Sequence, residues 1–574
     1  MNRLVQKAAS LLPILDWSRG YASPDLRADV IAGSVVLFVT VPQVIAYAFL
    51  AGMPAEAGLY GALFALVIYA FFGSSRALAV GPTAIVAMMT LEVASLHAEV
   101  GGEEYAVVVV QLSLITGLML IALRIVNFGS VVSFLSHAVV TGFITAAAIL
   151  IISNQMSALL GISASPDISL VGMGGHLLTE LAETNHLALA VSVVALLLLF
   201  LCRSRLRPLL ERLGLSETLI DSSVKSAPMY VVVLGILLTE LLDLQGSLPV
   251  VGSIPASLPD ISLTWISFTT LETLGPSAFL IALVVFIEST SIGTAMASKS
   301  RDKIDANQEL VGLGAANVGA SLVGAFPVAG SFARSAVNFS AGAVSPLASL
   351  VTAALLVVTI LVLAPFFYGL PKAVLAAIIV VSAWQLIDVA AIRKIIEFNR
   401  TDAITFGVTL SAVLVFGVDA GVLAGVVISF VLLIRNSARP NIAVVGRVGN
   451  SEHFRNVERH EVNTSAKLLA IRVDESLYFV NARFIEAYVL NELANRAEVE
   501  HLLLICTATN FIDTSGLEML EELSENLIET GVTLHLAEVK GPVMDKLKET
   551  SFYQNMRGKV YFTTDIAMRE LAGI

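Results

Sequence analysis

Long apolar runs, separated by short polar stretches, dominate the first 435 positions of the chain. A helix needs roughly 20 apolar residues to cross a membrane, and many of these runs meet or approach that length. Such windows lie at residues 30–50, 58–72, 106–123, 131–151, 187–201, 227–242, 279–297, 347–364, 374–386, 406–418 and 422–434. Three further segments, starting near Gly81, Gln308 and Ser331, are short or interrupted by Gly, Ser and charge. The pattern predicts an α-helical polytopic membrane protein with about 14 segments.

The pattern changes from Lys467 onward, where short apolar runs alternate with amphipathic stretches. Residues 468–473 and 476–480 are predicted to be paired strands, and residues 501–506 and 532–537 further strands. Helices are expected at residues 482–496, 514–530, 542–550 and 564–571. A small α/β domain is therefore predicted to follow the membrane segments.

Composition supports this division of the chain. Of its 574 residues 56% are hydrophobic and only 14% charged, yet 33 of the 80 charged residues lie within residues 441–574. The net charge of -12, with no basic stripe, argues against a nucleic-acid partner. Cys202 and Cys506 are far apart and have no metal-ligand spacing around them, so neither a disulfide framework, a metal nor a cofactor is expected. The apolar residues 11–15 are too few for a signal-peptide core.

Lys and Arg collect at alternate ends of the predicted spans, as the positive-inside rule requires. Residues 125–202 and 226–298 contain neither, although each includes a polar loop, so these loops are predicted to face outward. With an even number of segments, both termini are expected in the cytoplasm and the chain in the cytoplasmic (inner) membrane.

Two Gly/Pro breaks stand in corresponding places of the two halves. Residues 81–84, Gly-Pro-Thr-Ala, open a run too short to span, in which Pro82 suits the first helical turn and leaves the amides of Thr83 and Ala84 free. Residues 324–330 precede a second short helix that begins Ser331-Phe332-Ala333-Arg334. Such pairs indicate an inverted-repeat transporter whose half-helix N-termini meet near the midplane.

Two facing helix N-termini with Arg334 one turn inside predict an anion site. The alternatives are that a single break is an ordinary feature of membrane helices, and that Arg334 is a structural ion-pair partner. Glu288, near the middle of the window at residues 279–297, must be paired, hydrated or protonated. Our hypothesis is a proton-coupling site, because desolvation favours the neutral carboxyl. The alternative is a static salt bridge, with Arg334 as one partner.

At these positions the chain resembles the sulfate permease (SulP) family of anion transporters. The resemblance is carried by Pro42-Gln43-Val44-Ile45-Ala46-Tyr47-Ala48, by residues 53–60, by residues 305–312 and by Arg334-Ser335-Ala336-Val337-Asn338. It implies a seven-plus-seven inverted repeat, a core domain that moves against a gate domain, and a homodimer.

The resemblance also implies an anion site between the third and tenth helices. The matching positions here are Gln43, Tyr47, Thr83, Ala84, Ser331, Phe332, Ala333 and Arg334. Glu288 matches an acidic position of the eighth helix, where Glu is associated with proton coupling and Asp with sodium coupling. Gln43 and Tyr47 are four apart and share a helix face, although packing and a helix–helix hydrogen bond also explain them. Phe332-Ala333 carries no hydroxyl, fewer than some members of that family offer, which leaves backbone amides as the main ligands.

Residues 510–517, Asn-Phe-Ile-Asp-Thr-Ser-Gly-Leu, resemble the STAS domain shared by sulfate transporters and anti-sigma factor antagonists. The hydroxyl that is phosphorylated in the antagonists maps to Thr514, but Asp513 is also explained as a plain helix N-cap. The expected division is an N-terminal segment (1–27), a transmembrane domain (28–435), a linker (436–466) and a cytoplasmic STAS domain (467–574).

The predicted function is secondary active transport of a small anion by alternating access, with a proton or, alternatively, sodium as coupling ion. Sulfate is the first candidate, and bicarbonate or a dicarboxylate the others. An anion exchanger and a proton-coupled nucleobase transporter of similar fold are the alternatives; the latter has no need of Arg334. An enzyme is not expected, because the sequence shows no metal cluster, nucleophile–base pair or ATP motif.

Overall fold

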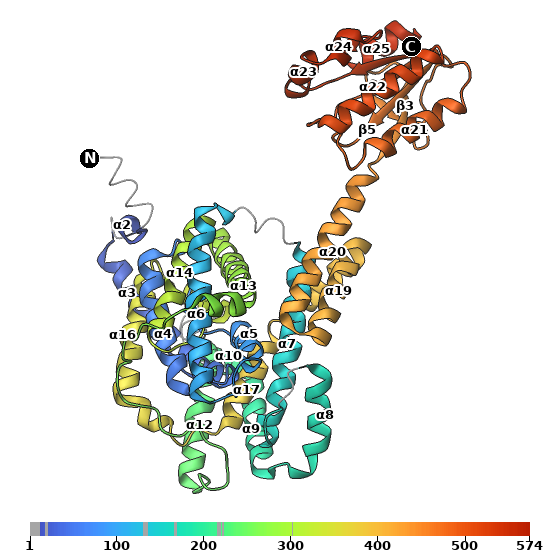
Figure 1. Ribbon diagram of the computed structural model, residues 1–574. Helices are drawn as coiled ribbons and strands as arrows, with labels where there is room; N and C mark the ends of the chain where they lie inside the picture. The colour runs from blue at the N-terminus through green and yellow to red at the C-terminus, as the bar shows by residue number, and fades with distance from the viewer. Residues whose placement is uncertain are drawn as a thin grey trace. The chain divides into compact units, whose positions relative to one another are not determined.

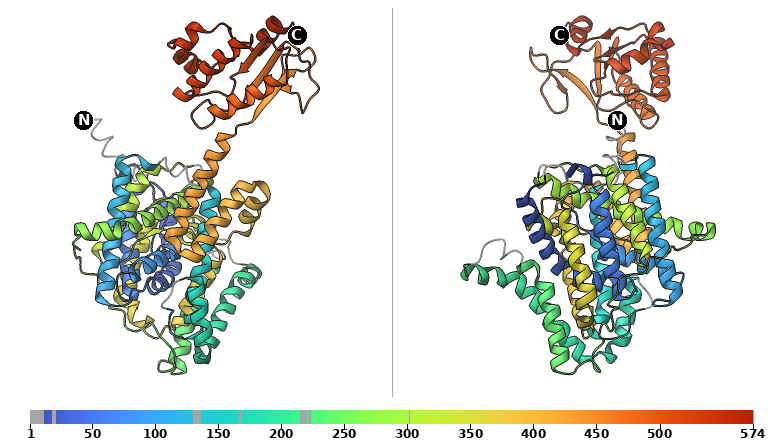
Figure 2. Two further views of the ribbon diagram at one scale, coloured as in Figure 1. Left: turned by 45° about the vertical axis from the view of Figure 1, so that its right-hand side comes forward. Right: turned by 90° about the vertical axis from the view of Figure 1, so that its left-hand side faces the viewer.

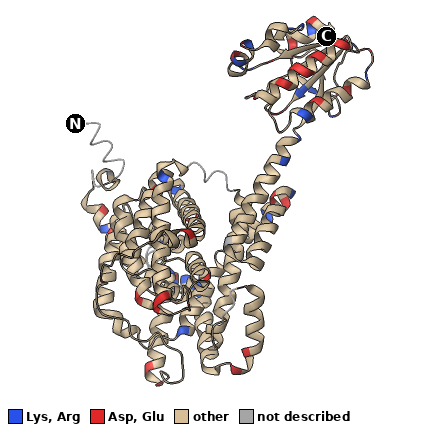
Figure 3. Ribbon diagram, viewed as in Figure 1, with Lys and Arg blue, Asp and Glu red and all other residues tan. Residues whose placement is uncertain are grey.

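The structure is a computed structural model that describes residues 12–17, 21–129, 136–165, 169–214, 220, 223–300 and 302–573. The chain forms two compact units, Met1–Val427 and Ile428–Ile574, and the division falls inside helix α20 (Figure 1). Charged residues are sparse over the helical unit and frequent over the second unit (Figure 3). The first unit therefore has the surface of a membrane protein and the second that of a soluble domain.

The long helices of the first unit run side by side (Figure 2). The first half contains α3 (Ser23–Leu50), α4 (Ala55–Phe72), α5 (Ala84–Ser95), α6 (Glu103–Ile125), α7 (His137–Leu160), α9 (His186–Leu201) and α12 (Ala227–Leu241). The second contains α13 (Phe268–Ser300), α14 (Ala306–Leu322), α15 (Phe332–Ser340), α16 (Leu347–Val358), α17 (Lys372–Trp384), α19 (Arg400–Phe416) and α20 (Val418–Ala438). Shorter helices are α2 (Ile14–Trp17), α8 (Leu170–Glu180), α10 (Arg207–Arg212) and α18 (Val389–Phe398).

The predicted membrane segments are confirmed as helices, except that residues 131–135 of one of them lie outside the described residues. Within the described ranges, nine helices are long and apolar enough to cross a membrane. The third member of each half, α5 and α15, is short, with 12 and 9 residues. Several helices are longer than their apolar windows; α13, for example, begins at Phe268.

Helix packing relates the two halves to each other. Helix α14 packs on α6, and α16 packs on α4. Because α4 and α14 are the second helices of their halves and α6 and α16 the fourth, these two contacts are equivalent in the two halves. The pairs α3–α16 and α13–α6 are equivalent in the same way. Gly117 and Gly314 let α6 and α14 touch backbone to backbone, because a Cβ on either would lie within 2.9 Å of the other's carbonyl oxygen. Small residues at such crossings are the usual basis of helix packing in membranes.

Two fully buried carboxylates tie loops to helices in this unit. Asp29 of α3 accepts hydrogen bonds from Tyr21, from Ser345 and from the Val344 amide. Glu309 of α14 accepts from the Tyr69 hydroxyl at 2.8 Å and from the amide and hydroxyl of Ser74 at 2.8 and 2.7 Å. Both carboxylates have 0% exposure, and their hydrogen bonds compensate for the lost hydration.

The second unit holds a six-stranded sheet in the order β4-β3-β5-β6-β7-β8. Its strands are β3 (Ile442–Arg447), β4 (Phe454–Asn456), β5 (Leu468–Val473), β6 (His501–Ile505), β7 (Thr533–Ala537) and β8 (Val560–Tyr561). Strands β5 to β8 are parallel, whereas β3 is antiparallel to both neighbours. The helices are α21 (Ala482–Ala494), α22 (Thr514–Glu529), α23 (Gly541–Lys548), α24 (Ser551–Asn555) and α25 (Thr564–Ala572).

Alternate strand residues face two separate cores. Leu502 and Leu504 of β6 pack with α21 to α24, whereas Leu503 and Ile505 pack with α25. Both faces of the sheet are therefore covered by helices, as in other α/β domains with mainly parallel strands.

The predicted strand at residues 476–480 is wrong. Only Leu477 forms a bridge there, to Ile512, and the residues after it turn into α21. The Asn481 side chain accepts from the Tyr478 amide and donates to the Ser476 carbonyl, so these backbone groups are satisfied locally rather than by a neighbouring strand. The antiparallel partner of β5 is instead β3, which precedes Lys467 and pairs on its other side with β4.

A pair of histidines lies on β6 and β7. His535 is 5% exposed, and its Nδ1 accepts from the Lys559 amide at 3.0 Å. The neutral ring therefore carries its proton on Nε2, which lies 3.2 Å from His501 Nδ1. Burial, together with the neighbouring His501, lowers the pKa of His535 to about 4.

We expect acid to destabilise this unit through His535. Because its pKa is lowered in the folded state, the unfolded chain binds the proton first, and stability falls as the pH drops from about 6.5 towards 4. Between pH 7 and pH 5 the loss should be about 1–2 kcal/mol, and His535→Asn, whose Oδ1 can accept from Lys559, should remove it. Amide hydrogen exchange of β6 and β7 in the full-length protein measures the effect. Equal pH dependence in both proteins would contradict the assignment to His535.

Glu309→Ala should lower the apparent unfolding temperature of the detergent-solubilised protein by several degrees. The substitution leaves the Tyr69 hydroxyl and the Ser74 amide buried without an acceptor, which costs about 3 kcal/mol. Glu309→Gln keeps one acceptor oxygen and should cost less than half as much. Glu99→Ala, at an exposed position, is the matched control and should leave the unfolding temperature unchanged. A Glu309→Ala protein as stable as this control would show that these hydrogen bonds contribute little.

Candidate functional site

The two Gly/Pro breaks meet in a buried two-stranded ribbon. Strand β1 (Val80–Gly81) pairs antiparallel with β2 (Ala329–Gly330), Val80 opposite Gly330. Each strand leads into a short helix, α5 after β1 and α15 after β2. Because the strands are antiparallel, both helices have their N-terminal ends at the ribbon and leave it in opposite directions. Their positive dipole ends therefore act on the same place.

Two serines satisfy backbone amides at and next to the ribbon. Ser289 Oγ of α13 accepts a hydrogen bond from the Gly330 amide of β2 at 2.8 Å. Directly before β1, Ser335 Oγ of α15 accepts from the Ala79 amide at 2.9 Å. A two-stranded ribbon inside an apolar unit would otherwise leave these amides unsatisfied, at a cost of several kcal/mol each.

Two asparagines hold the chain segments that lead into the ribbon. The Asn317 side chain pairs with Val328 like a further strand: Nδ2 donates to its carbonyl and Oδ1 accepts from its amide, both at 2.9 Å. Asn338 Nδ2 donates to the Ala77 carbonyl at 3.1 Å. All four polar side chains come from helices, so the position of the ribbon depends on the packing of α13, α14 and α15.

Arg334 crosses from α15 to the break in the first half. Its Nη2 donates to the Pro82 carbonyl at 2.7 Å, and the side chain is only 1% exposed. Among the described residues its Nε and Nη1 have no hydrogen-bond partner although both are buried. Gly81 lies close beside it: a Cβ there would be 3.3 Å from both Nη atoms, so the guanidinium would have to shift by a few tenths of an ångström. The site thus presents two unused donors of a buried cation.

Glu288 lies on α13, next to Ser289, and interacts electrostatically with Arg334 and Tyr47. Its Oε2 is buried without a hydrogen-bond partner in the described part of the chain. No ion pair within 4.0 Å joins it to Arg334 in that part either, so the static salt bridge is not formed in this structure. The two opposite charges are close enough to interact without neutralising each other directly.

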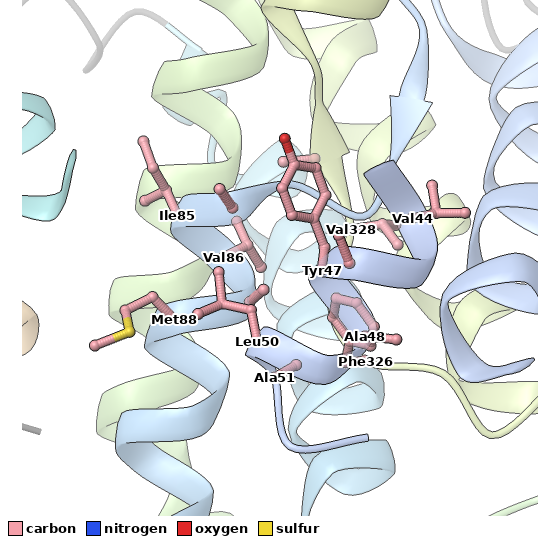
Figure 4. Close-up of a cluster of buried hydrophobic side chains, with 14 of the residues drawn as sticks. Val44, Tyr47, Ala48, Leu50, Ala51, Ile85, Val86, Met88, Phe326 and Val328 are labelled. Atoms are coloured by element: carbon pink, nitrogen blue, oxygen red, sulfur yellow. The ribbon is translucent and has the colours of Figure 1, made fainter. Parts of the chain in front are cut away.

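Gln43 and Tyr47 lie on α3, which packs on α5 and α15. Both are buried, and Gln43 Oε1 lacks a partner among the described residues. Figure 4 shows Tyr47 between Ile85 and Val86 of α5 and Val328 before β2, with its hydroxyl directed away from the apolar cluster. The polar end of this tyrosine therefore lies outside the apolar cluster, where it interacts with the Ser382 side chain of α17 and with the charge of Arg334.

The remaining predicted residues lie in the first turns of the two short helices. Thr83 and Ser331 occupy the N-cap positions of α5 and α15, and the hydroxyl of Thr83 is buried without a partner in the described structure. Ala84 is buried, whereas Phe332 is 53% exposed and forms the accessible edge beside Ala333. The predicted substrate residues thus lie in the first turns of the two short helices or on α3, which packs against both. The roles of Ser289 and Asn317 were not predicted, because their only signal in the sequence is a polar side chain within an apolar helix.

Thr514 is exposed at the start of α22. Asp513 caps this helix, because its Oδ1 accepts from the Gly516 amide at 2.8 Å and its Oδ2 from the Phe479 amide at 3.0 Å. A groove of about 390 Å³ lies beside them, lined also by Phe511 and Lys546. Phosphorylation of Thr514 stays a prediction.

Across the described ranges, no group of three or more His, Cys, Asp or Glu side chains is arranged to hold a metal ion.

Sequence comparison identifies both parts of the chain. Residues 26–409 match the Sulfate permease family and residues 459–567 the STAS domain. The chain is 32% identical to "Sulfate transporter 4.1, chloroplastic" of Arabidopsis thaliana, over 91% of this chain and 76% of that protein. It is 31% identical to Sulfate transporter 3.2 of the same plant, over 96% and 87%.

Solved structures share the fold. The murine Solute Carrier 26 family member A9 anion transporter in its inward-facing state superposes with a TM-score of 0.86 at 24% identity, over 96% of this chain and 92% of that one. The transmembrane domain of the cyanobacterial bicarbonate transporter BicA gives 0.60 at 21% identity, over 71% and 98%. The chain therefore belongs to the sulfate permease family: it is a multi-pass membrane transporter with a C-terminal STAS domain, and not an enzyme.

Proposed function

We propose that this protein transports sulfate across the cytoplasmic (inner) membrane together with a proton, with bicarbonate or a dicarboxylate as alternative substrates. The plant relatives are named sulfate transporters, which supports sulfate as the first candidate. The observation that carries the proposal is Arg334, a buried guanidinium whose Nε and Nη1 have no partner in the described structure. Buried cations are costly unless paired, so an anion is the expected ligand.

The surroundings of Arg334 suit a small oxyanion. The N-terminal ends of α5 and α15 each contribute roughly half a positive charge, and the amides after Thr83 and Ser331 supply donors. Guanidinium binds planar or tetrahedral oxyanions through two parallel hydrogen bonds. A divalent anion would therefore be stabilised electrostatically by both helix ends and by Arg334.

Glu288 is the proposed proton site. When it is ionised, its negative charge opposes an anion at Arg334, and when it is protonated this repulsion disappears. Proton and anion then favour each other's binding, which is the thermodynamic requirement for symport. Sodium remains the alternative coupling ion.

The transport cycle is proposed to follow alternating access, with a core domain that carries α5 and α15 moving against a gate domain in a homodimer. Both termini are proposed to be cytoplasmic, in keeping with the alternation of Lys and Arg along the chain. An inverted repeat with its site at the meeting point of two half-helices is the usual architecture for this mechanism.

Arg334→Ala should raise the KM for sulfate by about 10- to 100-fold, because a charge-assisted hydrogen-bond pair worth about 1.5–3 kcal/mol is lost. Uptake of labelled sulfate, bicarbonate and fumarate into proteoliposomes measures the effect. Arg393→Ala removes an Arg whose side chain is 78% exposed and serves as the matched control. Unchanged anion uptake in Arg334→Ala, or uracil uptake without anion uptake in the unmodified protein, would contradict the anion site.

Glu288→Gln should still take up anion down its gradient but should no longer respond to acid outside the vesicle. Gln keeps the size of the side chain and imitates the protonated carboxyl, so only the response to the proton gradient should disappear. The unmodified protein, measured with imposed proton and sodium gradients, is the reference. If sodium drives uptake and acid does not, the proton role of Glu288 is wrong.

A further inference from the structure

The long helices of the first unit pack as two groups. Helix contacts join α4, α6, α13, α14 and α16 into one group, and α7, α9, α12, α17 and α19 into the other. The N-terminal half of α20 belongs to the second group, because a Cβ on its Gly425 would lie 2.4 Å from Thr409 Oγ1 of α19 and 3.0 Å from Val139 Cγ1 of α7. The ribbon packs on α4 and α13 and so attaches α5 to the first group. We call the boundary between the two groups the seam.

Glu92 connects the two groups across the seam. It lies in the last turn of α5, and its carboxylate accepts a hydrogen bond from the Val418 amide, with Oε1 at 3.0 Å and Oε2 at 3.1 Å. Val418 is the first residue of α20, and the first amides of a helix have no carbonyl partner within it. A carboxylate at this place satisfies such an amide and is favoured by the helix dipole. A helix of one group therefore supplies the cap for a helix of the other.

Gly417 makes room for this contact. Its φ of +91° lies in the left-handed region that favours glycine, and a Cβ there would lie 2.0 Å from Glu92 Oε1. Any other residue at this position would strain the backbone and displace the carboxylate. The turn between α19 and α20 is thus shaped to receive a side chain from α5.

The contact lies on the side of the ribbon that the alternation of Lys and Arg places outside, because α5 begins at the ribbon and runs towards that end. Lys372 of α17 makes a second contact across the seam at the same end, with its Nζ 5.2 Å from the centre of the Phe49 ring of α3. Met88, drawn in Figure 4, lies one turn closer to the ribbon than Glu92 on the same face of α5, and its side chain is 0% exposed. The seam is therefore closed on the outer side of the candidate anion site.

We infer that Glu92 is a positioning residue for the transport cycle: it latches the outer side of the seam and releases the Val418 amide each time the site opens outward. The inference rests on the proposed function, because it uses alternating access between two groups of helices. When the groups move apart on the outer side, α5 separates from α20, and this movement breaks the charge-assisted hydrogen bond. The strength of the latch then sets the fraction of the protein that faces outward.

Glu92→Ala should therefore enlarge the outward-facing fraction about tenfold, since one hydrogen bond to a charged group is lost only from the closed state. A thiol at position 88 reports this fraction. Met88→Cys is introduced into a full-length protein in which Cys202 and Cys506 are replaced by Ala, and intact cells are treated with a negatively charged, membrane-impermeant thiol reagent. The labelling rate should rise about tenfold when Glu92→Ala is added.

Uptake of labelled sulfate by the same cells gives a second readout. The apparent affinity for an outside anion is reduced by the fraction of protein that is competent to bind it, so a larger outward-facing fraction should lower the KM several-fold. A residue that merely supports the fold would leave the KM unchanged or raise it when it is replaced.

Gly417→Ala breaks the latch without removing the carboxylate. It should raise the labelling rate as Glu92→Ala does, and the two substitutions together should add little to either one. Glu99→Ala is the matched control, because it removes an exposed carboxylate shortly after α5 and should leave the rate unchanged. If Glu92→Ala does not fold, as judged by size-exclusion chromatography, Glu92→Gln takes its place; it keeps one acceptor oxygen and should give a smaller rise.

The outcomes separate this inference from the proposed function. Equal labelling rates with and without Glu92, or an equal rise in Glu99→Ala, overturn the latch while Arg334 and Glu288 keep their proposed roles. Labelling of Glu92→Ala that is faster from the cytoplasmic side, measured in inside-out vesicles, overturns it as well. If the unmodified protein takes up no anion, the proposed function fails, whereas the labelling rates still decide whether Glu92 holds the seam closed.

Discussion

The hydrogen bond between Arg334 and the Pro82 carbonyl is the interaction on which the rest of the helical unit depends. It joins the second half of the chain to the first at the point where both are broken. Burying a guanidinium costs free energy, and this single bond satisfies only part of its hydrogen-bonding capacity. The structure around it, with two helix N-termini at the ribbon and Gly81 beside the guanidinium, concentrates positive potential where a small anion can complete the set of partners.

The broken segments create a second constraint, because irregular backbone inside a membrane must find its hydrogen-bond partners within the protein. Here the two breaks satisfy each other as β1 and β2, and side chains of Ser289, Ser335, Asn317 and Asn338 satisfy the remaining groups. The same bonds determine where α5 and α15 begin. The same contacts therefore satisfy the backbone and set the geometry of the site. A change in any of these contacts affects both.

The second unit follows ordinary rules of soluble α/β domains, with two apolar cores on either face of one sheet. Three of its six strands, β5, β6 and β7, were predicted, since runs such as Leu502 to Ile505 are apolar throughout; the cap Asp513 likewise marked the start of α22, whereas the two-residue strand β8 was not predicted. The strand expected at residues 476–480 does not form, because the apolar residues there reflect burial of Leu477 in a turn and not strand pairing. Strands β3 and β4 were not predicted, because they lie before the first clear strand pattern, which begins at Leu468.

The sequence alone determined the membrane class, the helical spans, the soluble tail and the place of the two breaks, because each depends on local patterns of apolar residues, glycine, proline and charge. It also indicated Arg334 and Glu288, since a charge within an apolar span is exceptional. Only the tertiary structure decided that the breaks pair as a ribbon, that Arg334 uses one donor on Pro82 and keeps two unused, and that Glu288 does not reach it. These are contacts between residues some 40 to 250 positions apart, for example Ser289 with Gly330 and Pro82 with Arg334, and no local pattern specifies such distances.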